Sequence, residues 1–105
     1  MLEYLELGKN FISNMDHLVN NPSNRFCFLT ELYLYSNQLM NIPHNLSYMQ
    51  LKVLNLNRNQ DLSLFTLGYC PLLETLSLSY CSFIQLKSLV GAPNLKDLDL
   101  SFNSI

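Results

Sequence analysis

The sequence predicts a repeat solenoid of the α/β class, in which short parallel strands line one face and turns or short helical segments line the other. The first observation is the pattern L-x-x-L-x-L-x-x-N/C, which occurs five times and begins at Leu2, Leu29, Leu51, Leu73 and Leu95. The second is spacing, because the last three intervals are each 22 residues and the first is 27. The third is that 15 of the 24 leucines stand where the pattern specifies them. A period this regular is the signature of a solenoid.

Each repeat contributes one predicted strand, at the L-x-L core of the pattern. In the first repeat, Leu5 and Leu7 fall on one side of an extended chain and Glu6 falls on the other. The other four repeats alternate in the same way, so we expect leucines inside and the intervening residues outside. Because the chain returns by the same route in every turn, neighbouring strands should be parallel and about 4.8 Å apart.

The segments between the strands are predicted to be short helical turns or loops. Leu86, Leu89 and Val90 stand at i, i+3 and i+4, which favours one helical or 3₁₀ turn. Leu64 and Leu67 take the equivalent positions one repeat earlier. The extra length of the first interval lies in residues 19–26, whose asparagines and proline predict a surface loop.

The ninth position of the pattern is predicted to be structural. It holds Asn10, Asn37, Asn59, Cys81 and Asn103 in the five repeats. A tight turn after each strand leaves inward backbone groups that need partners, and an amide side chain both donates and accepts. We therefore expect an asparagine ladder, in which Cys81 donates only weakly. We also expect an irregular third repeat, because Asp61 stands where an apolar residue belongs and Leu62 follows one place late.

These residues make the chain resemble a leucine-rich repeat protein over nearly its whole length. The 22-residue interval is similar to the short class found in regulatory subunits of protein phosphatase 1, a dynein light chain and bacterial internalins. Cys81 resembles the cysteine-containing repeats of F-box adaptors, although the interval is shorter than in that class. The resemblance implies a curved horseshoe with a parallel sheet on its concave side. It also implies that proteins or peptides bind there, with little catalysis by the repeats.

Candidate partner-binding residues lie at the outward strand positions. Tyr33 and Tyr35 project from the same face, and tyrosine and arginine are enriched among binding hot spots. Arg58 and Tyr80 share one edge column, and Asp97 with Asp99 forms an acidic end. The predicted set is Glu31, Tyr33, Tyr35, Asn55, Asn57, Arg58, Tyr80, Asp97 and Asp99. The alternative is that these are simply solvated strand residues.

The size of the face and the two ends of the repeat array bear on this prediction. Five strands about 4.8 Å apart give a footprint of a few hundred Å², below the roughly 800 Å² per partner of a standard interface. The leucines also run to both ends without polar caps, which solenoids normally carry. We therefore expect residues 1–105 to be one repeat domain, part of a longer array or able to associate end to end.

Other chemistry is not expected. His17 and His44 share no repeat column with a cysteine, and no metal-ligand spacing or phosphate-binding loop occurs, so we expect neither a metal nor a cofactor. The net charge of −2 gives no attraction to nucleic acid or to an anionic membrane. The acidic residues after Met1 argue against a signal peptide. Cys27, Cys70 and Cys81 cannot all pair, which favours reduced thiols and a cytoplasmic location.

The expected function is therefore that of a non-enzymatic protein-interaction scaffold. One alternative is a substrate-recognition segment of a larger enzyme, such as a ubiquitin ligase or a receptor kinase. Another is a structural spacer whose concave face binds nothing.

Overall fold

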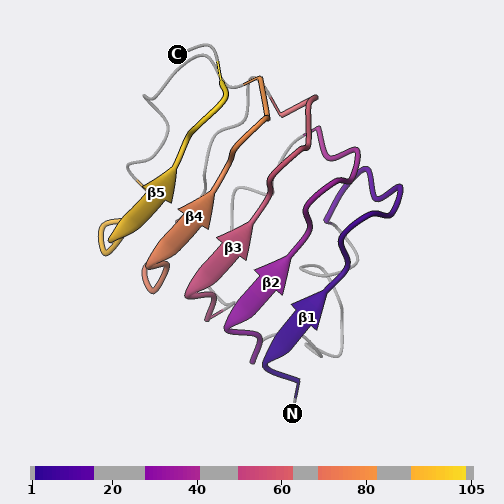
Figure 1. Cartoon of the computed structure of the whole chain (residues 1–105). Helices are drawn as coiled ribbons and strands as arrows, with labels where there is room; N and C mark the ends of the chain where they lie inside the picture. Colours follow the sequence, from indigo (N-terminus) through magenta and orange to yellow (C-terminus); the bar gives the residue numbers. More distant parts are fainter. Residues whose placement is uncertain (1, 16–27, 41–49, 63–68, 83–90, 104–105) are drawn as a thin grey trace.

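Five parallel strands form one sheet in the computed structural model, which describes residues 2–15, 28–40, 50–62, 69–82 and 91–103. The strands pair in chain order, so that the first and last lie at opposite edges of the sheet (Figure 1). They are β1 (Tyr4–Glu6), β2 (Glu31–Tyr33), β3 (Val53–Asn55), β4 (Thr75–Ser77) and β5 (Asp97–Asp99). The prediction of five short parallel strands, one per repeat, is confirmed.

The register aligns equivalent positions of all five repeats. Leu5 pairs with Leu32, and Leu32 with Leu54, so the longer first interval does not shift the frame. The ladder continues beyond the strands, because Leu34 N donates to Asn55 O at 2.8 Å and Ser36 N donates to Asn57 O at 2.8 Å. Each position of the pattern therefore forms a straight column across the sheet.

The leucine columns form the core, as the alternation predicts. Leu32, Leu54 and Leu76 are fully buried at 0% exposure. The outermost described repeats have a neighbour on one side only, and Leu2 and Leu98 are 46% and 40% exposed. The leucines are thus inward as predicted, and burial falls toward the two edges of the sheet. Ser79, which the alternation predicts to be outward, is instead buried at 7% exposure.

The ninth-position asparagines form the predicted ladder. Asn59 Nδ2 donates to Leu56 O at 2.8 Å and to Leu34 O of the preceding repeat at 3.0 Å. Its Oδ1 accepts from Leu39 N of the preceding repeat at 3.1 Å. One side chain therefore joins the third repeat to the second both as a donor and as an acceptor. Asn37 joins the second repeat to the first in the same way.

Cys81 supplies only the donor half of this bridge. Its Sγ donates to Leu56 O at 3.1 Å and Ser79 O at 3.5 Å, the positions that an asparagine amide would reach. The preceding repeat is irregular at the point where the missing amide oxygen would accept. There Asp61 is exposed, Leu62 is fully buried, and Leu62 N donates to Asn59 O within its own repeat at 3.1 Å. The predicted irregularity is confirmed, and it coincides with the cysteine.

Several sequence predictions lie outside the described residues. They concern the helical turns at Leu64–Leu67 and Leu86–Val90, the loop at residues 19–26, Cys27, and the two histidines His17 and His44. Among the residues that are described, no helix is long and apolar enough to cross a membrane.

Candidate functional site

The outward side chains of the sheet stand in three columns, which together are called the strand face. The first column is Tyr4, Glu31, Val53, Thr75 and Asp97. The second is Glu6, Tyr33, Asn55, Ser77 and Asp99. The third, two residues further along each repeat, is Gly8, Tyr35, Asn57, Ser79 and Ser101. The columns exist because side chains alternate along a strand while the register keeps equivalent positions opposite each other.

Aromatic and acidic residues alternate where β1 meets β2. Tyr4 pairs with Glu31 and Glu6 pairs with Tyr33, so the two tyrosines lie on one diagonal and the two glutamates on the other. The Tyr4 and Tyr33 ring centroids are 5.2 Å apart with the planes tilted by 41°. Tyr33 Oη donates to Glu31 Oε1 at 2.8 Å. This bond, aided by desolvation, raises the pKa of Tyr33 to about 12.

Tyr35 completes this group, because its ring lies over Gly8. A Cβ on Gly8 would stand 2.3 Å from Cε2 and Cζ of the Tyr35 ring, so only glycine leaves the ring its place. Desolvation raises the pKa of the Tyr35 phenol, and the nearby Glu6 carboxylate raises it further. The tyrosine–glutamate cluster is defined as Tyr4, Glu6, Glu31, Tyr33 and Tyr35.

The middle of the strand face is polar and uncharged. Asn55 Oδ1 accepts from Asn57 N at 3.0 Å. Asn57 Oδ1 accepts from Ser77 Oγ at 2.6 Å and from Ser79 N at 2.8 Å. Asn55 therefore fastens the chain as it leaves its own strand, whereas Asn57 joins the third repeat to the fourth.

The far end of the strand face carries the two predicted aspartates. Asp97 and Asp99 are both exposed. Asp99 Oδ1 accepts from Ser101 Oγ at 2.6 Å and from Ser101 N at 2.9 Å, and these bonds lower its pKa. Asp99 thus fastens its own turn while keeping a negative charge at the surface.

A fourth column, the edge column, follows the strand face at the next position of each repeat. Its members are Lys9, Ser36, Arg58, Tyr80 and Phe102, all with left-handed backbones at φ of 53–60°. No member is glycine, although that conformation costs other residues roughly 1–2 kcal/mol. Arg58 Cζ lies 4.2 Å from the centroid of the Tyr80 ring, and Tyr80 stacks on Phe102 at 4.4 Å with an interplanar angle of 8°. Sequence reasoning selected Arg58 and Tyr80, and the structure stacks them.

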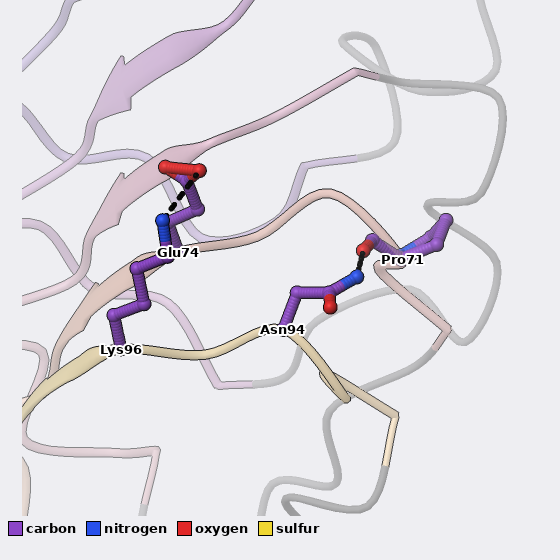
Figure 2. Close-up of polar contacts among 4 residues, drawn as sticks. All are labelled: Pro71, Glu74, Asn94 and Lys96. Carbon is purple, nitrogen blue, oxygen red and sulfur yellow. Dashed lines mark hydrogen bonds and ion pairs between the residues drawn. The ribbon is translucent and has the colours of Figure 1, made fainter.

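Charge is distributed unevenly around the sheet. The strand face bears Glu6, Glu31, Asp97 and Asp99 and carries no lysine or arginine. Lys52 and Lys96 instead stand beside the strand starts, where Lys96 Nζ lies 3.4 Å from Glu74 Oε1 (Figure 2). On the same side, Asn94 Nδ2 donates to Pro71 O at 2.6 Å. Within the described ranges Lys96–Glu74 is the only ion pair, so the four carboxylates of the face have no cationic partner there.

Tyr4, Glu6 and Phe102 share the candidate surface, although the sequence-based set of partner-binding residues does not include them. Tyr4 and Glu6 complete the tyrosine–glutamate cluster, and Phe102 extends the edge stack while remaining 70% exposed. The available signal was their place in the same columns as Glu31, Tyr33 and Tyr80.

The described cysteines are unsuited to nucleophilic chemistry. Cys70 and Cys81 are free and buried, and burial raises the pKa of both thiols, that of Cys70 to about 11. A thiol held protonated is a poor nucleophile. Across the described part of the chain, no group of three or more His, Cys, Asp or Glu side chains is placed to hold a metal ion.

Comparison with known proteins agrees with the fold. One Leucine Rich Repeat family model matches residues 28–49, and a second matches residues 91–105. No curated protein and no solved structure gives a significant match. The matched segments contain β2 and β5, and the same ladder joins them to the other three repeats. The chain therefore contains leucine-rich repeats and has the fold of a leucine-rich repeat protein.

Proposed function

We propose that this protein is an interaction module that binds a protein or peptide segment through its strand face. Leucine-rich repeat domains generally mediate protein–protein interaction, and their repeats are typically non-catalytic. The leucine columns form the buried core, so they cannot contact a partner. The strand face points outward and is open to one.

The tyrosine–glutamate cluster is the observation that carries this proposal. It gathers three phenol rings on one outward surface, and Tyr4 is 53% exposed. Tyrosine combines a large contact area with a hydroxyl that fixes orientation, and it is enriched among binding hot spots. Gly8 also supports a binding role for the cluster, because its lack of a side chain leaves room for the Tyr35 ring.

The size of the face favours a short segment over a large globular surface. Five strands about 4.8 Å apart span roughly 20 Å, which about six extended residues cross at 3.3 Å each. Adding a peptide strand at a sheet edge is a known recognition mode. Here, however, the columns favour a segment that runs across the strands and meets one column position at a time.

The proposal is tested by selecting binders and then blocking the face. Random peptides displayed on phage are selected against the immobilised protein, and the affinities of the enriched peptides are measured by fluorescence anisotropy. Thr75→Tyr places a bulky ring at the centre of the face, where the threonine is half-buried. We expect it to weaken binding at least tenfold. Gln60→Tyr adds the same ring at an exposed position outside the sheet and should leave the affinity unchanged.

Two results would contradict the proposal. Enriched peptides that bind the Thr75→Tyr variant as tightly as the parent protein would show that another surface is used. A selection that enriches no peptide would favour a structural spacer.

A further inference from the structure

The charge of the strand face limits what can cover it. Its three columns hold four carboxylates and no cation, and none of the four pairs with a cation within the described ranges. A partner that covers the face excludes water from these carboxylates. Glu6, Glu31 and Asp99 accept hydrogen bonds from Gly8 N, Tyr33 Oη and Ser101, but these neutral donors leave the negative charges in place. Burying an ionised carboxylate without an opposite charge is costly, so a stable complex needs cations from the partner.

The tyrosine–glutamate cluster suits one cationic side chain in particular. Glu6 and Glu31 lie on opposite corners of the group, with the Tyr4 and Tyr33 rings on the other two corners. A guanidinium or ammonium group here meets negative charge from the glutamates and ring faces from the tyrosines, each of which attracts a cation. The protein already uses such a contact at its edge, where the Arg58 guanidinium stacks on Tyr80 at 4.2 Å.

The second acidic site lies at the other end of the face. Asp97 and Asp99 are on β5, three strands beyond β2. At about 4.8 Å per strand the two sites are roughly 14–19 Å apart, which an extended chain crosses in about five residues. Between them lie Val53, Asn55, Thr75 and Ser77, which carry no charge.

Building on the proposed function, we infer that the strand face takes an extended basic segment of a partner protein. One arginine or lysine seats at the tyrosine–glutamate cluster, and a second, about five residues away, meets Asp97 and Asp99. Small polar residues between the two lie over the uncharged middle of the face.

A pair of synthetic peptides tests this inference. One has two arginines five positions apart, separated by serine and glycine, and the other has citrulline in place of both arginines. Binding is followed by NMR titration of the isotope-labelled protein. We expect the arginine peptide to shift resonances of β1, β2 and β5, to bind at least tenfold more tightly than the citrulline peptide, and to weaken as salt rises.

Three variants make the test specific. Glu31→Gln removes one charge of the cluster, and Gly8→Ala displaces the Tyr35 ring without changing any charge. Each should weaken the arginine peptide severalfold. Asp61→Asn removes an exposed acid outside the strand face and should leave its affinity unchanged.

The outcomes separate this inference from the proposed function. Equal binding of the arginine and citrulline peptides, or no detectable binding at millimolar concentration, overturns the basic-segment inference. If phage-selected peptides are still blocked by Thr75→Tyr, the proposed function stands and the partner has other chemistry. If no bound peptide responds to Thr75→Tyr, the proposed function fails as well.

Discussion

The guanidinium of Arg58 stacks on the Tyr80 ring of the next repeat, with Cζ 4.2 Å from the ring centroid. The two residues hold the same position of adjacent repeats and have nearly equal left-handed φ angles of 60° and 56°. The shared backbone conformation directs both side chains the same way and brings them face to face. A strained turn thus becomes the basis of a contact between repeats.

This contact should be measurable by a double-mutant cycle. Arg58→Ala, Tyr80→Ala and the double variant are compared by urea denaturation. Because Arg58 is exposed, we expect a coupling energy of about 0.5–1 kcal/mol. Tyr80→Ala should cost more than Arg58→Ala, because it also removes the stack on Phe102. Additive single effects would contradict the contact.

The strained turns themselves should respond to glycine. Ser36 has φ of 53°, and its N–H donates to Asn57 O at 2.8 Å. Ser36→Gly relieves the strain but adds freedom to the unfolded chain, so we expect a net gain of up to about 1 kcal/mol in the free energy of unfolding. Ser36→Val should lose at least about 1 kcal/mol, because a β-branched residue fits this conformation poorly. Thermal denaturation of the two variants decides the sign.

The inward and outward assignment is tested by a neighbouring pair on β4. Leu76 is fully buried, and Leu76→Ala should cost about 2–5 kcal/mol through lost burial and a cavity. Thr75→Ala, at the adjacent outward position, should change stability by about 0.5 kcal/mol or less. Ser77 is a poorer control because its hydroxyl donates to Asn57 Oδ1. Similar losses at Leu76 and Thr75 would contradict the assignment.

The ladder positions should differ in their importance. Asn59→Ala leaves Leu39 N, Leu34 O and Leu56 O without their side-chain partner, and we expect a loss of at least about 3 kcal/mol. Cys81→Ala removes only weak thiol donors together with a small apolar side chain, and should cost clearly less. Urea denaturation of the two variants gives the comparison, and equal losses would contradict the unequal roles.

The phenol of Tyr33 predicts a dependence of stability on alkaline pH. Its pKa is raised to about 12 in the folded protein, against about 10 in the unfolded chain. The folded state therefore holds this proton more tightly. The resulting stabilisation is fully present below pH 10 and is lost as the pH rises through 12. Glu31→Ala removes both the acceptor and its charge, and should lower the pKa of Tyr33 toward 10, measured by NMR of the labelled tyrosine ring carbons. An unchanged pKa in that variant would contradict the assigned cause.

The fold could be predicted from the sequence because the regular spacing of the buried leucines fixes which residues face the core and which strands pair. Leu5 and Leu32 are 27 positions apart and yet pair in the same column. The repeat pattern predicts this pairing, because both residues hold its fourth position. The asparagine ladder was equally accessible, since an inward amide has few roles other than bonding backbone groups.

The site was less accessible because it depends on how individual side chains turn. Nothing in the sequence marks Gly8 as the place where the Tyr35 ring lies. Asn55 and Asp99 were predicted to bind a partner because of their outward position. In the structure, the side-chain oxygen of each accepts a hydrogen bond from the backbone N–H two residues further along. The left-handed backbone of the edge column could not be predicted from the sequence either. Its members are lysine, serine, arginine, tyrosine and phenylalanine, and these residue types share no preference for that conformation.

Cys81 has a consequence for how the protein comes apart. In a solenoid, stability is close to a sum of terms from each repeat and from each junction between neighbours. The junction between the third and fourth repeats lacks the amide oxygen that bridges the junction before it, whereas Asn103 Oδ1 accepts from Cys81 N beyond it. The Arg58–Tyr80 stack and the bonds of Asn57 to Ser77 and Ser79 still hold the outer side of this junction, so the weakness lies on its interior side. Under mild denaturant, hydrogen exchange should report lower protection at the amides of Asp61 and Leu62 than at that of Leu39, which donates to Asn59 Oδ1.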